Sequence, residues 1–555
     1  MISNKTLFIG IFSLCFAGFA TAQDQKSGEI KDAEFIIQKD RLITLPVASR
    51  NFEKIPPVPK AKPLTSMQYQ FKDFAFPVPG ISTDVRPFNL AFKPLEKQTY
   101  PLYVKLGYGN YNTPYGELWY NSLNSDLYTY GVHAKHINYM NGPVDQQNSA
   151  ENHTNIALKG QYFGRTSVIK GNIFFDRDQY HFYGYTPIPA TEILAEDIRQ
   201  RFVNFGGQVG IENLDKMDAF TYSATLGARF FQDFYEATEN EITITGGLAY
   251  QPQTNFKVGL DIGTYLTSPR DLNVNVNRNL FRGTPYLTLG QPDQLYFKGG
   301  VNVVQENDDF VGKESDLHIY PTLLLSYQII KELAVEIALD GDMERNTLLS
   351  FVNMNPWMRN DLNLLNTNKL YEASAKVNGR LAGDFNFEVG FSYAERTNEA
   401  FMANAASDST RFDLIYESGF SRTSNIFVGF HYDKNDIYKV GLRADMYRYD
   451  LENLQEAYHR PQYSIKVYNT VKPLAKWTFQ GDVTFMGGID ALNLESGFTT
   501  RLDPFIDLNF RTDFQMTPRV GLFLNLDNAL GREYQRYLNY DTRGFQILGG
   551  LSFKL

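Results

Sequence analysis

Cysteine is nearly absent from this sequence of 555 residues. The one cysteine, Cys15, lies in an N-terminal segment that has the features of a secretory signal. Phe12, Ser13 and Leu14 precede it, and these are not the small residues that stand before the cysteine of a lipoprotein. We therefore expect an exported mature chain that contains no thiol, no disulfide and no cysteine metal site.

A long apolar run is also missing. The most apolar segment, residues 6–19, is shorter than the roughly 20 residues that a transmembrane helix needs. It follows Lys5 and precedes the small residues Ala20, Thr21 and Ala22, so residues 1–22 are predicted to be a signal peptide that is cleaved. In a bilayer only helices and closed barrels satisfy their backbone groups, so a membrane-embedded mature chain has to be a barrel.

Strong charge and recognisable catalytic motifs are missing as well. A formal net charge of −9 is mild for this length and argues against a nucleic-acid partner. The sequence shows no phosphate-cradling loop and no serine nucleophile elbow. His133 and His136 face opposite sides of a strand-like run, and the other candidates, His153, His181 and His459, fit solvated loop positions better than catalytic ones. We predict no enzyme activity, no cofactor and no metal site.

Aromatic residues, in contrast, are abundant, with 35 Tyr and 43 Phe. Such residues are favoured in strands and at membrane interfaces. From Tyr100 onward, apolar and polar residues alternate in runs of about a dozen residues, which indicates strands with one apolar face. In residues 332–344 the apolar face consists of Leu333, Val335, Ile337, Leu339, Gly341 and Met343. The C-terminal run, residues 543–555, alternates in the same way except at Leu548.

The connections between these runs alternate between short and long. Residues 164–166 and 515–517 are tight turns, whereas 140–152 and 346–369 are long loops. This layout is typical of outer-membrane barrels and predicts an all-β, antiparallel transmembrane barrel of about 22 strands over residues 100–555. Residues 411–436 fit either two spans or one span with an extended loop. A soluble sandwich or propeller would show the same period, but cysteine-free export, the turn and loop asymmetry, and aromatic residues near strand ends favour the membrane.

Residues 23–99 differ in composition from the rest of the chain. Ten of the 24 prolines lie between Pro46 and Pro101, which suits an extended or polyproline segment. It is predicted to be an extended linker on the periplasmic side, or a segment that lines the barrel lumen. A third reading is that an apolar run, such as Phe35, Ile36 and Ile37, pairs with a periplasmic protein partner.

The long loop over residues 346–369 is rich in apolar residues, among them Phe351, Trp357 and Leu364. Exposed apolar patches usually mark interactions, so we expect this loop to fold over the barrel mouth or to touch a partner. Packing of these side chains within the loop itself is an equally good reading.

The C-terminal hairpin resembles the closing strands of TonB-dependent receptors, most of all those of Bacteroidetes-type bacteria. The resemblance rests on residues 527–534, on Gly544-Phe545 and on residues 550–555. It implies an uptake receptor in the outer membrane of a Gram-negative bacterium, in contact with lipid and lipopolysaccharide. Members of that family carry a folded plug domain before the barrel, whereas residues 23–99 show no plug pattern. Residues 35–37 are a candidate contact for a TonB-like partner.

Two functions follow from these expectations. The first is a receptor or transport barrel that passes an unidentified solute. The second is a structural or assembly scaffold, in which the proline-rich segment and the long loops dock other envelope proteins. Some 22 strands enclose a wide lumen, which has to be blocked by residues 23–99, by inward-folded loops or by another protein.

Overall fold

The structure of the protein is a computed structural model. It describes residues 100–555 except for residues 124, 188–191, 272–274, 309–314, 382–383 and 435–436. The predicted signal peptide, the proline-rich segment and Phe35, Ile36 and Ile37 lie outside the described residues. No helix in the described part of the chain is long and apolar enough to cross a bilayer.

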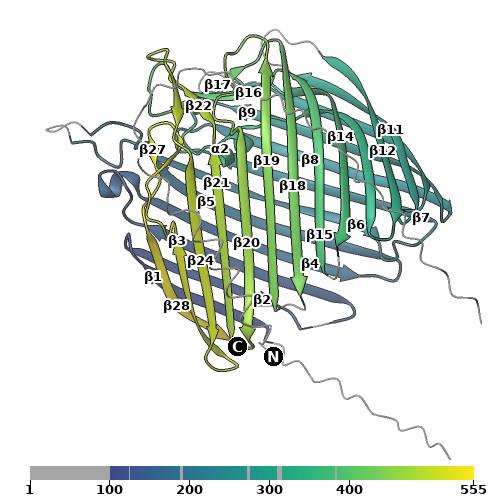
Figure 1. The fold of residues 1–555 in the computed structure, drawn as a ribbon, viewed down its shortest axis with the longest axis horizontal. Helices are drawn as coiled ribbons and strands as arrows, with labels where there is room; N and C mark the ends of the chain where they lie inside the picture. The colour runs from purple at the N-terminus through teal and green to yellow at the C-terminus, as the bar shows by residue number, and fades with distance from the viewer. Residues whose placement is uncertain are drawn as a thin grey trace, which may run out of the picture. The chain divides into compact units, whose positions relative to one another are not determined.

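The described chain forms one 22-stranded antiparallel sheet that closes on itself, as predicted (Figure 1). The first strand, β1 (Leu102–Gly109), pairs with β2 (Thr113–Asn121) on one side and with the last strand, β28 (Gln546–Lys554), on the other. This pairing removes the edges that an open sheet would expose. The remaining barrel strands are β3 (Tyr128–Tyr139), β4 (Glu151–Phe163), β5 (Ser167–His181), β6 (Arg199–Asn213), β7 (Phe220–Gln232), β8 (Thr238–Gln253), β9 (Phe256–Arg270), β10 (Arg278–Gly290), β11 (Leu295–Asp308), β12 (Asp316–Ile330), β13 (Leu333–Glu344), β14 (Thr367–Leu381), β15 (Phe385–Thr397), β18 (Phe420–Lys434), β19 (Tyr438–Leu451), β20 (Tyr463–Leu474), β21 (Trp477–Gly487), β24 (Phe505–Gln515) and β25 (Val520–Asp527).

The alternation in sequence becomes an apolar outer face and a polar inner face. In β28, Ile547 and Leu551 are exposed on the outer face, whereas Ser552 is buried on the inner face. Leu548, the residue out of step in the sequence, points inward and is 8% exposed. An outer face of this kind suits lipid and an inner face of this kind suits water.

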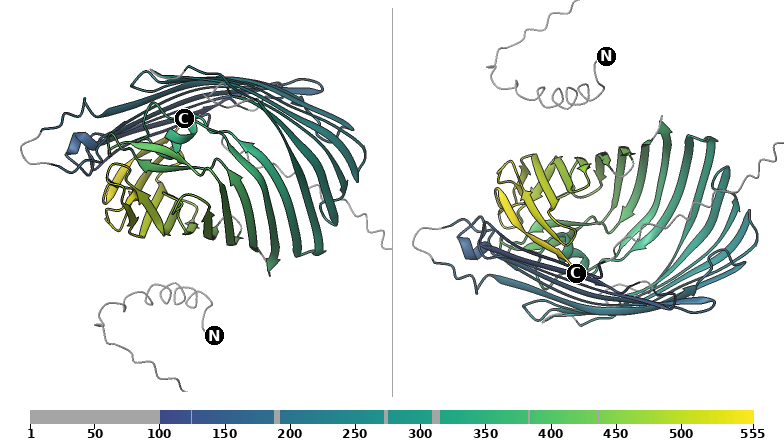
Figure 2. Two further views of the ribbon diagram at one scale, coloured as in Figure 1. Left: turned by 90° about the horizontal axis from the view of Figure 1, so that it is seen from above. Right: turned by 90° about the horizontal axis from the view of Figure 1, so that it is seen from below.

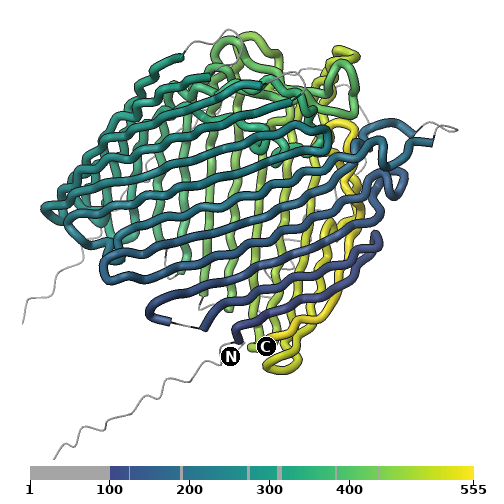
Figure 3. The backbone as a smooth tube through the Cα atoms, turned by 180° about the vertical axis from the view of Figure 1, so that it is seen from behind, coloured from purple at the N-terminus to yellow at the C-terminus, as the bar shows by residue number. Residues whose placement is uncertain are grey.

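The connections fall into two classes at the two ends of the barrel. We call these the short-turn end and the long-loop end; in outer-membrane barrels the short turns face the periplasm. Residues 411–436 contain a single span, β18, because β17 (Phe412–Tyr416) pairs instead with β16 (Ala400–Asn404) in a small separate sheet. Neighbouring strands of the barrel run side by side over most of their length, as the backbone trace shows (Figure 3).

The long loops carry the remaining secondary structure and gather at the long-loop end, where η1 projects outward from the barrel (Figure 2). We call this assembly the loop cap. Its helix α2 (Leu348–Met354) begins after Thr347, whose hydroxyl accepts a hydrogen bond from the Ser350 N–H in a capping box. Its other elements are η1 (Gln146–Ser149), β16, β17, β22 (Ile489–Leu492), β23 (Thr499–Leu502), β26 (Gln535–Tyr537) and β27 (Tyr540–Asp541).

One strand departs from the expected alternation. β13 pairs with β12 only from Leu333 to Leu339, and beyond Leu339 it leaves the wall and enters the lumen. Met343, predicted on the outer apolar face, is 2% exposed and packs with Tyr320 on the inner face of β12. The prediction for Met343 was wrong because alternation fixes the facing of a side chain only while the strand stays in the wall.

Candidate functional site: the capped lumen

The inner face of the barrel carries charges that pair across strands. Three acids of β13 form ion pairs there. Glu336 pairs with Lys376 at 2.8 Å, Asp340 with Lys369 at 2.7 Å and Asp342 with Arg282 at 2.6 Å. Half-buried pairs of this kind are accessible to water and to a hydrophilic solute. The lumen is therefore a polar passage and not a packed core.

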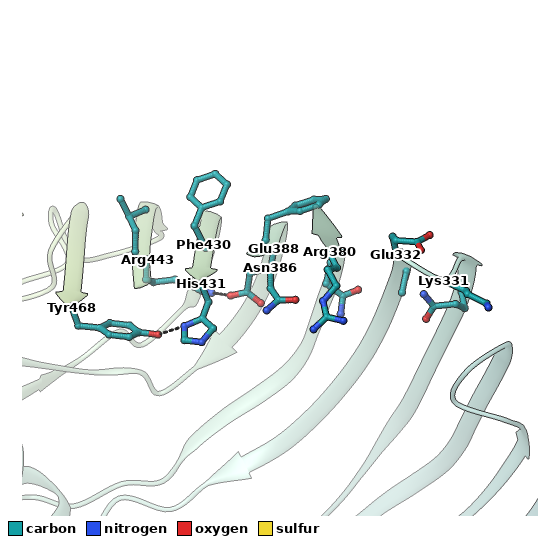
Figure 4. A pocket seen from close by; sticks show the side chains of 16 residues that line it. Lys331, Glu332, Arg380, Asn386, Glu388, Phe430, His431, Arg443 and Tyr468 are labelled. Atoms are coloured by element: carbon teal, nitrogen blue, oxygen red, sulfur yellow. Dashed lines mark hydrogen bonds and ion pairs between the residues drawn. The ribbon is translucent and has the colours of Figure 1, made fainter. Parts of the chain in front are cut away.

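A recess of about 600 Å³ opens on this inner face toward the short-turn end (Figure 4). Arg443 lies between Glu388 and Asp445, with closest contacts of 2.5 and 2.9 Å. His431 Nδ1 and the Tyr468 hydroxyl are 3.0 Å apart on the adjoining strands. The recess is lined by hydrogen-bonding groups, so it suits a polar occupant.

The loop between β13 and β14 is one of the two longest loops of the loop cap and is held by a buried carboxylate. Glu239 of β8 is fully buried and accepts a hydrogen bond from the Leu348 N–H at 2.7 Å. Arg229 of β7 pairs with the same carboxylate at 3.1 Å. A buried charge is tolerated only when it is paired and hydrogen-bonded, so these contacts fix α2 against the wall.

Aromatic side chains form the centre of the loop cap. Trp357 stacks on Tyr540 with ring centroids 3.8 Å apart, and Tyr183 meets Tyr540 edge-on at 4.9 Å. The Trp357 indole N–H donates to the His181 carbonyl at 3.0 Å, and Phe412 closes the cluster from β17. These rings come from four different loops, so the cluster holds the loops together.

Two buried arginines join the loop cap to the barrel wall. Arg278 of β10 pairs with Asp308 at 2.8 Å and donates to the Asn346 carbonyl at 2.6 Å. Arg543, between β27 and β28, pairs with Glu151 of β4 at 2.9 Å. The cap is therefore attached to the rim at β10 and at β4.

A chamber of about 450 Å³ lies between the loop cap and the inner wall near the closing strands. Both carboxylates and guanidinium groups face it, together with aromatic rings. The lining includes Glu151, Asp507, Asp527, Asp541, Arg536, Arg543, Tyr139, Tyr183, Trp357, Tyr534, Tyr537 and Tyr540. Charged groups that flank flat rings can hold a polar solute by ionic contact and stacking at once.

His459 is buried in the loop cap next to Arg536, which is half-buried and lines this chamber. His459 is 4% exposed, and its ring packs edge-on against Phe412 at 5.3 Å. Burial, together with the nearby Arg536 guanidinium, lowers the pKa of His459 to about 3, and burial also lowers the pKa of Arg536. His459 is thus neutral at physiological pH and acts as a packing group.

The structure places all three residues predicted at the mouth in the loop cap. Phe351 and Leu364 are buried, at 2% and 4% exposed, and Trp357 is half-buried beside them. Their side chains pack with those of other loops in the cap cluster. His133 on the inner face contacts Glu117 at 3.0 Å, and His136 on the outer face contacts Thr154 at 2.8 Å. Among the described residues, no group of three or more His, Cys, Asp or Glu side chains is placed to hold a metal ion.

Sequence reasoning missed Glu239, Arg278 and Tyr540. Each lies in or beside a strand, where a charged or aromatic residue gives no sign of a long-range partner. Their partners are far away in sequence, at Leu348, Asn366 and Trp357. A charged residue near the loop end of a predicted strand is the one signal that could have drawn attention to Glu239 and Arg278.

The sequence matches no protein-family model and no curated protein. Solved structures, however, share the fold. The ferric-catecholate import receptor Fiu from E. coli K12 matches with a TM-score of 0.62 and 9% identity over 82% of this chain and 81% of its own. The siderophore receptor PiuA from Acinetobacter baumannii matches at 0.61 and 11% identity over 83% and 82%. The copper transporter OprC matches at 0.61 and 9% identity over 82% and 80%.

These similarities concern the fold. The chain has the 22-strand barrel that these outer-membrane receptors and transporters have, in agreement with the architecture implied by the C-terminal hairpin. This fold matches a location in the outer membrane. The proteins that share it are receptors and transporters and not enzymes.

Proposed function

We propose that this chain is a receptor and transport barrel of the outer membrane, similar to TonB-dependent receptors of the Bacteroidetes type, that passes a polar solute through its lumen. The observation that carries the proposal is a closed barrel with a charged inner face and with loops that pack together at its long-loop end. A structural barrel has no need of a polar passage, whereas a transporter needs both a passage and a closure. The fold neighbours, which take up siderophores, iron or copper, support uptake as the direction of transport.

The substrate class follows from the chamber under the loop cap. Its carboxylates, guanidinium groups and tyrosine rings favour a solute with polar or charged groups and at least one flat or apolar part. The recess at the short-turn end provides a second polar binding site on the same inner face.

The chain also needs a way to open the loop cap. We assign coupling to residues 23–99, with Phe35, Ile36 and Ile37 as the contact for a TonB-like partner, after removal of residues 1–22 as a signal peptide. Photo-crosslinking from these three positions in cells tests the assignment. Adducts with an energy-coupling protein of the inner membrane support it, and adducts with outer-membrane proteins alone contradict it.

Conductance tests the transport proposal itself. Replacing residues 346–366 by a short Gly-Ser linker removes the main component of the loop cap, so purified protein in a planar bilayer should conduct far more than the parent. Replacing the exposed turn over residues 214–219 at the short-turn end is the control and should leave conductance unchanged. A cap-deleted barrel that folds but stays closed to ions would refute transport and would favour the scaffold function.

A further inference from the structure

The barrel wall contains a free edge at the long-loop half of β12. Residues 316–322 of β12 pair with β11, for example Tyr320 with Asn302, but they have no partner on the other side because β13 leaves the wall at Leu339. No hydrogen bond joins the backbone of residues 316–322 to β13 or to any loop that the structure describes.

The end of β13 lies on the lumen side of β10 to β12 and is held there. The Asn302 side-chain amide donates to the Gly341 carbonyl at 3.2 Å and to Asp342 Oδ1 at 2.9 Å. The Arg282 guanidinium donates to the Met343 carbonyl at 3.1 Å. Met343 is buried against inward side chains of three strands, Leu280, Val304 and Tyr320. These contacts fix β13 inside, so it is not available to cover the edge of β12.

The free edge lies at the depth of the membrane. Tyr327, an exposed aromatic residue of the outer face, marks the short-turn end of β12, and Leu317 precedes it by ten residues. At roughly 3.3 Å per residue and a tilt of about 35–45°, that distance corresponds to a height of about 23–27 Å. The apolar band of such barrels is about 25 Å tall, so Leu317 lies at its upper boundary and residues 319–322 lie within its upper part. Leu317 and Ile319 face outward and are 59% and 65% exposed.

Hydrocarbon cannot satisfy the backbone groups of such an edge. Open sheet edges do not occur in contact with lipid, because unpaired N–H and C=O groups have no partner there. Pro321 removes one donor from this stretch, as prolines do in edge strands. On the inner face of the same stretch, His318 Nε2 and Thr322 Oγ1 are buried and have no hydrogen-bond partner among the described residues. The backbone of this stretch therefore requires a polar partner that lipid does not supply.

A second copy of this chain does not fit the edge. Two barrels in one membrane are related by an axis along the bilayer normal, which makes both β12 strands run in the same vertical direction with opposite tilts. Antiparallel pairing, however, needs two strands that run in opposite directions, so two copies of β12 cannot pair in this way.

We propose that the free edge of β12 pairs with a transmembrane strand of another outer-membrane barrel protein, one whose own barrel is unfinished or has an open seam. A finished barrel has no strand to offer, so the partner has to have an unpaired edge of its own. The strand runs antiparallel to residues 316–322, with apolar side chains beside Leu317 and Ile319 and polar ones toward His318 and Thr322. This inference goes beyond the transport function and does not depend on it.

Photo-crosslinking in the native outer membrane tests the pairing. A benzoylphenylalanine is placed at Ile319 or Leu317 of the full chain, and at Leu325 as the matched control, because Leu325 faces outward but pairs with both Phe297 and Ile337. Heat-modifiable mobility on gels confirms that each variant is folded. We expect adducts with a transmembrane strand of a separate barrel protein from 319 and 317, and not from 325. The crosslinked position in the partner should shift by about two residues in the antiparallel sense between the two probes.

A charged residue introduced at the edge of β12 provides a second test of the pairing. Ile319→Lys should lower the crosslink from position 317 by about tenfold, because a charged edge residue blocks strand addition, whereas Leu325→Lys should leave it unchanged. Lipid adducts at 319 equal to those at 325, adducts with residues 23–99 of the same chain, or adducts with a second copy would each overturn the proposal. These crosslinking experiments do not measure conductance, so a failure of the pairing proposal can be distinguished from a failure of the transport proposal.

Discussion

Phe351→Ala should loosen the loop cap while it leaves the barrel intact. Phe351 is 2% exposed and lies in the cap cluster next to Leu348 and Val352. Removing a fully buried Phe costs about 3–5 kcal/mol when the site cannot collapse. Because about 1.4 kcal/mol corresponds to a factor of ten, the population of open cap should rise between about a hundredfold and a few thousandfold.

Hydrogen exchange and conductance measure this opening. Amides of residues 346–366 should exchange faster by the same factor, up to the limit set by unfolding of the whole barrel, and single-channel records should show more frequent openings. Phe391→Ala is the matched control, because Phe391 is 46% exposed on the outer face of β15 and touches no part of the cap cluster. If Phe351→Ala and Phe391→Ala gave the same exchange and the same conductance, the loop cap would not be the closure of the lumen.

Three further predictions concern the loop cap and the closure of the barrel. The loop cap should lose stability as pH falls from about 6.5 toward 3, by about 1.4 kcal/mol per pH unit. The reason is that the His459 side chain binds a proton below pH 6.5 when the cap is open but only below about pH 3 when it is buried in the closed cap. Trp fluorescence measured against pH should show this loss of stability, and His459→Phe should abolish the pH dependence. Arg278→Ala should lower the free energy of unfolding by about 3–5 kcal/mol in denaturant titrations, because it removes the guanidinium group that pairs with the buried Asp308 carboxylate. Lys216→Ala removes an exposed ion pair and should change the free energy of unfolding by less than about 1 kcal/mol. Gly550→Ala should prevent β1 from pairing with β28, because a Cβ atom at this position would lie 2.1 Å from the Leu106 carbonyl oxygen. Gly549→Ala should fold, because its Cβ atom would meet its nearest neighbour at 3.7 Å. Heat-modifiable mobility on gels distinguishes the folded from the unfolded variant, and equal folding of both variants would contradict the tight contact at Gly550.

Much of the fold could be predicted from local pattern. The alternation of Ile547, Leu551 and Ser552 predicted the faces of the last strand, and the alternation of short and long connections predicted 22 spans. Residues 411–436 could not be resolved in the same way, because β17 has the composition of a spanning strand but is too short to cross. The candidate site was predicted only in part. Phe351, Trp357 and Leu364 were identified from their apolar character in a long loop, whereas Glu239 and Arg278 were not identified.

The sequence by itself determined the class of the protein, because a side-chain period of two is a local property and because lipid outside and water inside impose opposite polarity on alternate residues. Only the tertiary structure decided that the loops close the mouth, that β13 turns inward at Leu339, and that residues 316–322 are left as a free edge. These features depend on contacts between residues far apart in the chain, such as Arg282 with Met343 and Glu239 with Leu348. Such contacts leave no periodic signal in the sequence, because the two partners are far apart in the chain and meet only in the folded structure.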